Sequence, residues 1–157
     1  MKNQTVVERQ SEREVIAKRT INGPPHLVFK AWTEPDLFKR WWVPASIPMK
    51  LVGCEMDVRT GGSYRLVFEM ESQTAAFFGK YIEVTPSSRL VWTNDEGGED
   101  AVVVTTVTFE ERDGKTLMTM HELHPSKAAL DEAIESGAMA GTPEQWDQLE
   151  EFILTLQ

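Results

Sequence analysis

Hydrophobic and polar residues alternate along several short stretches of the chain, a pattern typical of half-buried β-strands. In the stretch "SYRLVFEM", Tyr64, Leu66, Phe68 and Met70 share one face. The other stretches that predict strands are 13–21, 55–59, 77–84, 89–93, 101–111 and 115–123. Because short turn sequences such as "TGG" and "RDG" separate them, we expect an antiparallel sheet in which consecutive strands are neighbours.

Helical periodicity follows the first of these strands. The prolines of "NGPP" begin a short helix that ends near Thr33, and the stretch 33–42 predicts a second one with Thr33 as its cap. Pro44 prevents its continuation. Trp41 and Trp42 belong to an apolar face of this helix, which is too short to be stable alone and must lie on an apolar surface.

The end of the chain is also helical. One helix is predicted over 126–137, with Ser126 as its cap and Gly137 as its stop. A second begins with Thr142 as its cap and Pro143 at the first helical position, and it continues to the C-terminus. Its apolar stripe consists of Trp146, Leu149, Phe152, Ile153 and Leu156. A two-faced helix of this length can cross a sheet, which predicts an α+β fold.

Composition and charge narrow the class of protein. The 157 residues favour a single domain over 13–157, preceded by a flexible, charged arm over 1–12. A formal net charge of −9 argues against nucleic-acid binding, and no apolar run is long enough for a membrane span. The single cysteine, Cys54, cannot form an intramolecular disulfide, and the polar N-terminus does not resemble a signal peptide, so we expect a cytoplasmic location.

Five blocks of the sequence carry a resemblance to a known family. They are "RTINGPPHLVFKAWTEPDLFKRWWVP", "EMDVRTGGSYRLVFEM", "GKYIEVTPSSRLVWT", "VTFEERDGKTLMTMHEL" and "WDQLEEFIL". In this order they resemble the heat-shock protein 90 ATPase activator homologue family, within the helix-grip superfamily of Bet v 1-like, START and polyketide-cyclase domains. The resemblance covers Arg13 to the C-terminus. It implies a curved antiparallel sheet with two short helices, a long C-terminal helix gripped by the sheet, and an apolar cavity between sheet and helix.

The sequence departs from the family pattern before the last helix. In the family that segment often carries a tryptophan after a glycine, whereas here "ESGAMAGTPEQW" inserts a turn and delays Trp146. We therefore expect a cavity mouth of different shape.

Strand parity and the resemblance together predict the residues that line the cavity. Aromatic and methionine side chains suit a pocket for variable apolar shapes, and they equally suit a filled core that pins the short helices to the sheet. The candidates are Phe38, Trp41, Trp42, Tyr64, Leu66, Phe68, Met70, Trp92, Val107, Phe109, Met118, Met120, Glu122, Trp146, Leu149, Phe152 and Ile153.

Glu122 is the charged residue among these candidates. It shares the strand face of Met118 and Met120, where a carboxylate is costly in its charged form unless it is paired. Arg19 or Arg59 would complete a buried ion pair with it. Recognition of the polar head of a ligand is the alternative role of this carboxylate.

The tetrapeptide "HELH" does not predict a metal site. It lacks the gap of the zinc motif His-Glu-x-x-His, and residues three apart on a strand face opposite ways, which separates His121 from His124. Since no cysteine or histidine cluster completes a tetrahedral set, we expect neither a metal nor a cofactor.

These patterns predict a non-catalytic binding domain that holds a small hydrophobic or amphipathic molecule between the sheet and the C-terminal helix. One alternative is a cyclase- or hydrolase-like enzyme with Glu122, Tyr64 or His121 as acid or base, although no set of nucleophile, base and orienting group is recognisable. Another is an interaction protein that activates a chaperone ATPase. Homodimerisation through an exposed sheet edge also remains open.

Overall fold

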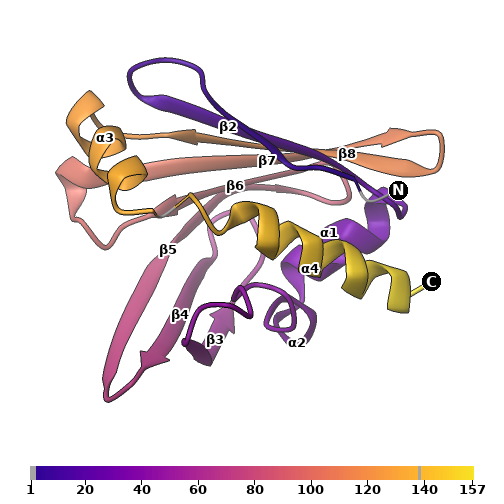
Figure 1. The fold of residues 1–157 in the computed structure, drawn as a ribbon, viewed down its shortest axis with the longest axis horizontal. Coiled ribbons are helices and arrows are strands. Elements are labelled where there is room, and N and C mark those ends of the chain that lie inside the picture. Colours follow the sequence, from indigo (N-terminus) through magenta and orange to yellow (C-terminus); the bar gives the residue numbers. More distant parts are fainter. Residues whose placement is uncertain (1–2, 138) are drawn as a thin grey trace.

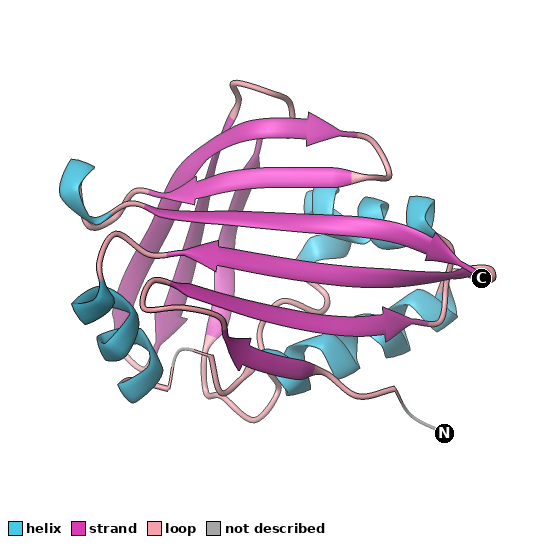
Figure 2. Cartoon of the chain, turned by 90° about the horizontal axis from the view of Figure 1, so that it is seen from above, coloured by secondary structure: helices cyan, strands magenta, loops and turns pink. Residues whose placement is uncertain are grey.

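The computed structural model of the chain describes residues 3–137 and 139–157. Its main element is an antiparallel sheet of eight strands that curves around two helices (Figures 1 and 2). The strands are β1 (Val6–Arg9), β2 (Glu14–Ile21), β3 (Lys50–Met56), β4 (Ser63–Met70), β5 (Gln73–Thr85), β6 (Arg89–Asn94), β7 (Val103–Arg112) and β8 (Lys115–Leu123). Their order in the sheet is β1-β2-β8-β7-β6-β5-β4-β3, so the predicted run of consecutive neighbours is confirmed from β3 to β8.

Over the described residues, four α-helices accompany the sheet. They are α1 (Pro25–Thr33), α2 (Pro35–Phe38), α3 (Lys127–Glu135) and α4 (Thr142–Thr155), and a short 3-10 helix spans Glu99–Ala101. Helices α1 and α4 lie against the concave face of the sheet, whereas α3 lies at one end of it (Figure 1). The predicted α+β helix-grip arrangement is therefore confirmed.

A sharp bend in the sheet separates β3 and β4 from the other strands. Residues 73–80 of β5 pair with β4, whereas residues 81–85 pair with β6, so β5 belongs to both halves (Figure 2). Gly79 lies at the bend, where a Cβ would lie 1.7 Å from the carbonyl oxygen of Thr93. The Tyr64 hydroxyl donates to that same oxygen at 2.7 Å and ties the two halves together.

The core fills the space between α1, α4 and the sheet. Its fully buried side chains come from all three, and they include Ile21, Val28, Val107, Met118, Trp146, Leu149 and Ile153. Trp41 is also fully buried, and its indole N–H donates to the Ala31 carbonyl at 3.0 Å. Burial of aromatic and aliphatic side chains on this scale is the main stabilising term of the fold.

A buried ion pair fixes α4 to the sheet. Arg19 of β2 is 2% exposed, and it lies 2.7 Å from Glu150 and 2.6 Å from Asp147, both on α4. The second carboxylate oxygen of Glu150 accepts from the Asn22 backbone N–H at 2.6 Å and from the Asn3 side chain at 2.8 Å. The sequence suggested Arg19 as a partner of Glu122, but Arg19 is paired within this network. The second suggested partner, Arg59, pairs with Asp57 instead.

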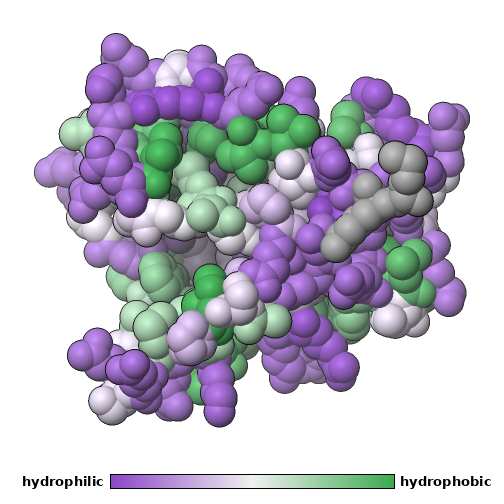
Figure 3. Space-filling view, viewed as in Figure 1, coloured by the Kyte–Doolittle hydropathy of each residue, from purple (hydrophilic) through white to green (hydrophobic). Residues whose placement is uncertain are grey.

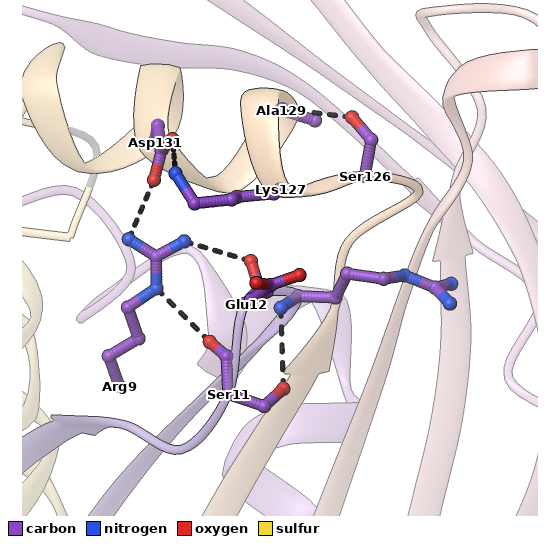
Figure 4. Close-up of polar contacts among 8 residues, drawn as sticks. Arg9, Ser11, Glu12, Ser126, Lys127, Ala129 and Asp131 are labelled. Carbon is purple, nitrogen blue, oxygen red and sulfur yellow. Dashed lines mark hydrogen bonds and ion pairs between the residues drawn. The ribbon is translucent and has the colours of Figure 1, made fainter.

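Residues 6–9 differ from the expectation of a flexible arm over 1–12, because they form the edge strand β1. All four side chains of β1 are exposed, so the strand has no buried face that a hydrophobic pattern could reveal. Backbone pairing with β2 holds it, and Arg9 reaches Asp131 of α3 at 2.7 Å (Figure 4). Lys127 contacts the same carboxylate at 2.8 Å, and these two bonds lower the pKa of Asp131.

Two predicted helix boundaries also shift. The second helix ends at Phe38 rather than continuing to Trp42, so both tryptophans lie in the turns that follow α2. The N-cap residue of α4 is Gly141 rather than Thr142, whereas the predicted cap of α3 is confirmed, since Ser126 accepts from the Ala129 N–H at 3.0 Å (Figure 4).

Candidate ligand-binding cavity

A cavity of about 480 Å³ lies on the concave side of the bend in the sheet. Its walls come from the turns after α2, from β3 to β8, and from the first turn of α4 with the segment before it. The space-filling view shows a hollow on this side of the molecule with hydrophobic residues gathered around it (Figure 3). The volume falls within the range of about 300–1,000 Å³ that is usual for small-molecule sites.

Eight of the seventeen predicted cavity residues line this space. They come from α2 and the turn after it, from the β4 face, and from the two strands β6 and β8: Phe38, Trp42, Tyr64, Leu66, Phe68, Trp92, Met120 and Glu122. The period-two pattern of β4 placed three of them on one face, and the structure brings that face to the cavity.

The other nine predicted residues do not line it. Met70 is 43% exposed at the end of β4, and most of the others lie in the packed core beneath α1 and α4. The nine residues are Trp41, Met70, Val107, Phe109, Met118, Trp146, Leu149, Phe152 and Ile153. The apolar stripe of α4 therefore packs directly on the sheet and α1, and the cavity adjoins the first turn of this helix. Helix α4 contributes only Thr142 and Gln145 to the lining.

Sequence reasoning missed much of the remaining wall. The missed residues include Trp32, Ile47, Met49, Met56, Phe77, Tyr81, Leu90 and Thr105. Thr105 could have been found from strand parity, since it alternates with the predicted Val107 and Phe109 on β7, whereas only the pairing register with Trp92 identifies Tyr81. Ile47 and Met49 lie in a loop without periodicity, so the sequence carries no signal for them.

Aromatic rings form the continuous part of the wall. The ring centroid of Trp32 lies 5.8 Å from that of Trp42 and 5.7 Å from that of Trp92. Phe38 stacks on Trp42 with centroids 4.5 Å apart. Trp32 donates to the Met118 sulfur at 3.2 Å, whereas the indole N–H groups of Trp42 and Trp92 have no acceptor among the described residues. Two of the tryptophans at the wall therefore have indole donors that no described protein group engages.

One row of directly opposed residues crosses the floor of the cavity. Tyr81 of β5 pairs with Trp92 of β6, Trp92 with Thr105 of β7, and Thr105 with Glu122 of β8. All four line the cavity. A phenol, an indole, a hydroxyl and a carboxylate therefore follow one another across four strands, while the neighbouring row of Leu90, Val107 and Met120 is apolar.

The two tyrosines of the chain both face this cavity in their neutral form. Burial is the main cause that raises the pKa of Tyr64 and of Tyr81 far above the ordinary value for a phenol. Neither phenol can therefore act as a base near neutral pH. The Tyr64 hydroxyl already donates to the Thr93 carbonyl, which leaves the Tyr81 hydroxyl as the unengaged phenol of the pair.

The candidate acid and base residues do not come together. His121 lies on the opposite face of β8 from Glu122, and it contacts Glu14 at 2.7 Å, a bond that lowers the pKa of Glu14. Burial raises the pKa of the Cys54 thiol, which keeps it protonated and a poor nucleophile. Within the described part of the chain, Glu122 has one partner, His124, with Nε2 at 3.3 Å from Oε1.

Neither a metal cluster nor a membrane span is found in the part of the chain that the structure describes. No three histidine, cysteine, aspartate or glutamate side chains in 3–137 and 139–157 approach one another closely enough to hold an ion. None of the helices over these same residues has the length and hydropathy needed to cross a bilayer.

Comparisons with known proteins find a family model and solved structures that are similar to this chain. The model of the family described as Activator of Hsp90 ATPase homolog 1-like protein matches residues 22–153. A solved structure from Nitrosomonas europaea is 26% identical, with a TM-score of 0.83, over 93% of this chain and 97% of that chain. One from Rhodobacter sphaeroides is 19% identical, with a TM-score of 0.89, over 97% of this chain and 99% of that chain.

A third similar structure is the AHSA1-like protein of Aeromonas hydrophila. It is 20% identical, with a TM-score of 0.71, over 91% of this chain and 93% of that chain. No curated protein matches the chain. At 19% and 20% identity, the last two structures support the fold alone.

Proposed function

Because the chain belongs to the family of Activator of Hsp90 ATPase homolog 1-like proteins, and because an apolar cavity of small-molecule size opens beside its sheet, we propose that it is a non-catalytic binding protein. Its ligand is a small hydrophobic or amphipathic molecule held in that cavity. The single observation that carries this proposal is a space of about 480 Å³ walled by aromatic and methionine side chains. A ligand that fills this space removes its apolar surface from water, which favours binding.

The chemistry around the cavity favours binding over catalysis. The buried phenols stay protonated, and His121 lies on the other face of the sheet from the cavity floor. Glu122 therefore has no second catalytic group beside it except His124, which precedes Pro125 outside the lining. A carboxylate with one histidine beside it and no nucleophile fits recognition of a polar head group better than bond cleavage.

Chaperone binding is a second candidate, and exposed apolar side chains on one hairpin favour it. Phe77, Phe78 and Met70 are each 40–43% exposed on the β4–β5 hairpin, Phe77 and Met70 on its inner face and Phe78 on its outer face. Exposed apolar side chains on a projecting hairpin suit a protein partner. Stimulation of an Hsp90 ATPase by the chain would support this candidate, and no stimulation at high concentration removes it. We place either activity in the cytoplasm, where a lone cysteine stays reduced.

Native mass spectrometry of the protein purified from its host tests the binding proposal. We expect a mass excess from an apolar adduct. After removal of that adduct, a neutral probe such as N-phenylnaphthylamine should bind with a stoichiometry of one. At a probe concentration of about 100 times Kd, binding stabilises the fold by about 2.7 kcal/mol, which raises Tm by roughly 5–10 °C for a chain of this size. An empty mass, together with an unchanged Tm across a library of apolar compounds, would contradict the proposal.

A further inference from the structure

The cavity holds an acidic side chain whose one partner among the described residues is His124. Glu122 is the one charged residue in its lining, and no lysine or arginine of the described chain lines it. The two arginines that could have neutralised Glu122 are engaged elsewhere, Arg19 with Glu150 and Arg59 with Asp57. Arg19 shares the inner face of the sheet with Glu122, but the residue of β2 opposite Glu122 is Val15. Arg19 lies four residues further along the strand, a distance of about 13 Å at the rise of a β-strand.

The carboxylate of Glu122 keeps one oxygen for a ligand. Oε1 lies 3.3 Å from His124, at the long end of hydrogen-bond distances, and Oε2 has no partner among the described residues. A smaller cavity of about 110 Å³ under α3 adjoins the first at Met120, Glu122 and Thr142. Its lining adds His124 but no lysine or arginine among the described residues, so neither side of Glu122 supplies a cationic side chain other than this histidine.

The same polar row carries an aromatic side chain two strands away from Glu122. Trp92 is separated from Glu122 by Thr105 alone, so about 10 Å of sheet lies between the indole and the carboxylate. Trp32 lies 5.7 Å from Trp92 and widens this aromatic surface. Tryptophan is the side chain whose face attracts organic cations most strongly, and the attraction grows when water is excluded.

From these contacts we infer that the ligand is a small apolar molecule that carries a positively charged amine, whose ammonium group lies over Thr105 between the Trp92 indole and the Glu122 carboxylate. The inference rests on the proposed function, because it names the class of ligand for the same cavity. The ammonium N–H groups donate to the free Glu122 oxygen and to the Thr105 hydroxyl, and the apolar body occupies the aromatic and methionine wall.

The same geometry excludes anionic ligands. A fatty acid would bring a carboxylate into a cavity that already holds Glu122 and offers no lysine or arginine in its described lining. Two unpaired negative charges in an apolar site repel each other and lose their hydration. The net charge of −9 adds a weaker, longer-range repulsion.

Isothermal titration with three ligands of one chain length tests the inference. Octylammonium, octanol and octanoate differ only in the polar head. We expect octylammonium to bind about tenfold more tightly than octanol, and octanoate about tenfold more weakly, at physiological salt. In Glu122→Gln the advantage of octylammonium should fall to about threefold or less, because only the attraction to Trp92 remains, while the affinity for octanol stays within about threefold of the parent value.

A matched control separates the cavity from the general charge of the protein. Glu151→Gln removes one carboxylate from the exposed face of α4, and it should leave the preference for octylammonium intact. If octanol binds as tightly as octylammonium, or if Glu122→Gln keeps the preference, the amine inference fails and the binding proposal stands. If none of the three ligands binds the parent protein, both fail. The comparison among ligands in the unmodified protein needs no variant, so it holds even where a variant folds poorly.

Discussion

Arg19→Met destabilises the protein by about 3–5 kcal/mol, because it leaves the carboxylate of Glu150 buried without its cation. Arg19 and Glu150 are 2% and 5% exposed, so water cannot replace the lost partner. The ion pair also joins α4 to β2, so its loss weakens the packing of this helix over the core. Urea unfolding followed by tryptophan fluorescence measures the loss as a lower midpoint at constant slope.

An exposed ion pair provides the control for this substitution. Arg112 lies 3.1 Å from Glu110, and about 60% of each side chain is exposed. Arg112→Met should change the stability by less than about 1 kcal/mol. A loss of that same small size in Arg19→Met would contradict the role given to the buried pair.

Met120→Trp removes ligand binding without unfolding the protein. Met120 lines both the main cavity and the smaller one beside it, so a larger ring at this position occupies the space that a ligand needs. We expect the affinity for N-phenylnaphthylamine to fall by about tenfold or more. Because cavity-filling substitutions commonly stabilise by about 0.5–2 kcal/mol, Tm should stay the same or rise. Fluorescence titration and a melting curve measure the two effects.

A tryptophan placed on the surface controls for the added ring. Leu154 is 55% exposed on α4, so Leu154→Trp should leave the affinity for the dye unchanged. Leu66→Trp fills the cavity from the β4 wall, and it repeats the test if Met120→Trp packs badly. Unchanged dye binding in both cavity-filling variants would place the ligand elsewhere.

Local pattern predicted most of the fold because the elements concerned each bury one face. In β4, every second residue from Tyr64 to Phe68 is buried, and the sequence shows that alternation directly. In β1 all four residues are exposed, so no alternation marks it, and its pairing with β2 depends on backbone hydrogen bonds alone. A strand of this kind can be predicted only when the strand beside it, here β2, is already known to form the edge of the sheet.

Only part of the candidate site could be predicted, and the reason is related. Parity identifies which face of a strand points inward, but it does not say where that face meets empty space rather than another side chain. Val107 and Met118 share the inner face with Thr105 and Glu122, yet α1 and α4 cover the first two and leave the others at the cavity. The bend at Gly79 decides this division, and it results from a close backbone approach that no periodicity reveals.

The partner of Glu122 illustrates a second limit. Strand pattern suggests Arg19 as the counterion of Glu122, since both residues lie on inward faces of adjacent strands. Their separation along the strands and the arrival of Glu150 from α4, 131 positions away in the sequence, direct Arg19 to another carboxylate. Long-range packing of this kind leaves Glu122 facing the cavity, and it is the basis of the ligand class inferred above.

The five tryptophans provide the most direct measurement of whether the cavity is the ligand site. Trp42 and Trp92 line the cavity with unengaged indole N–H groups, whereas Trp146 is fully buried in the core and outside the lining. Single tryptophan-to-phenylalanine variants assign the indole signals in a nitrogen–proton correlation spectrum, and N-phenylnaphthylamine is then added to saturation. The account predicts that the Trp42 and Trp92 signals shift while the Trp146 signal stays in place. A shift of the Trp146 signal with those of Trp42 and Trp92 unmoved, or no shift in any of the three, would contradict it.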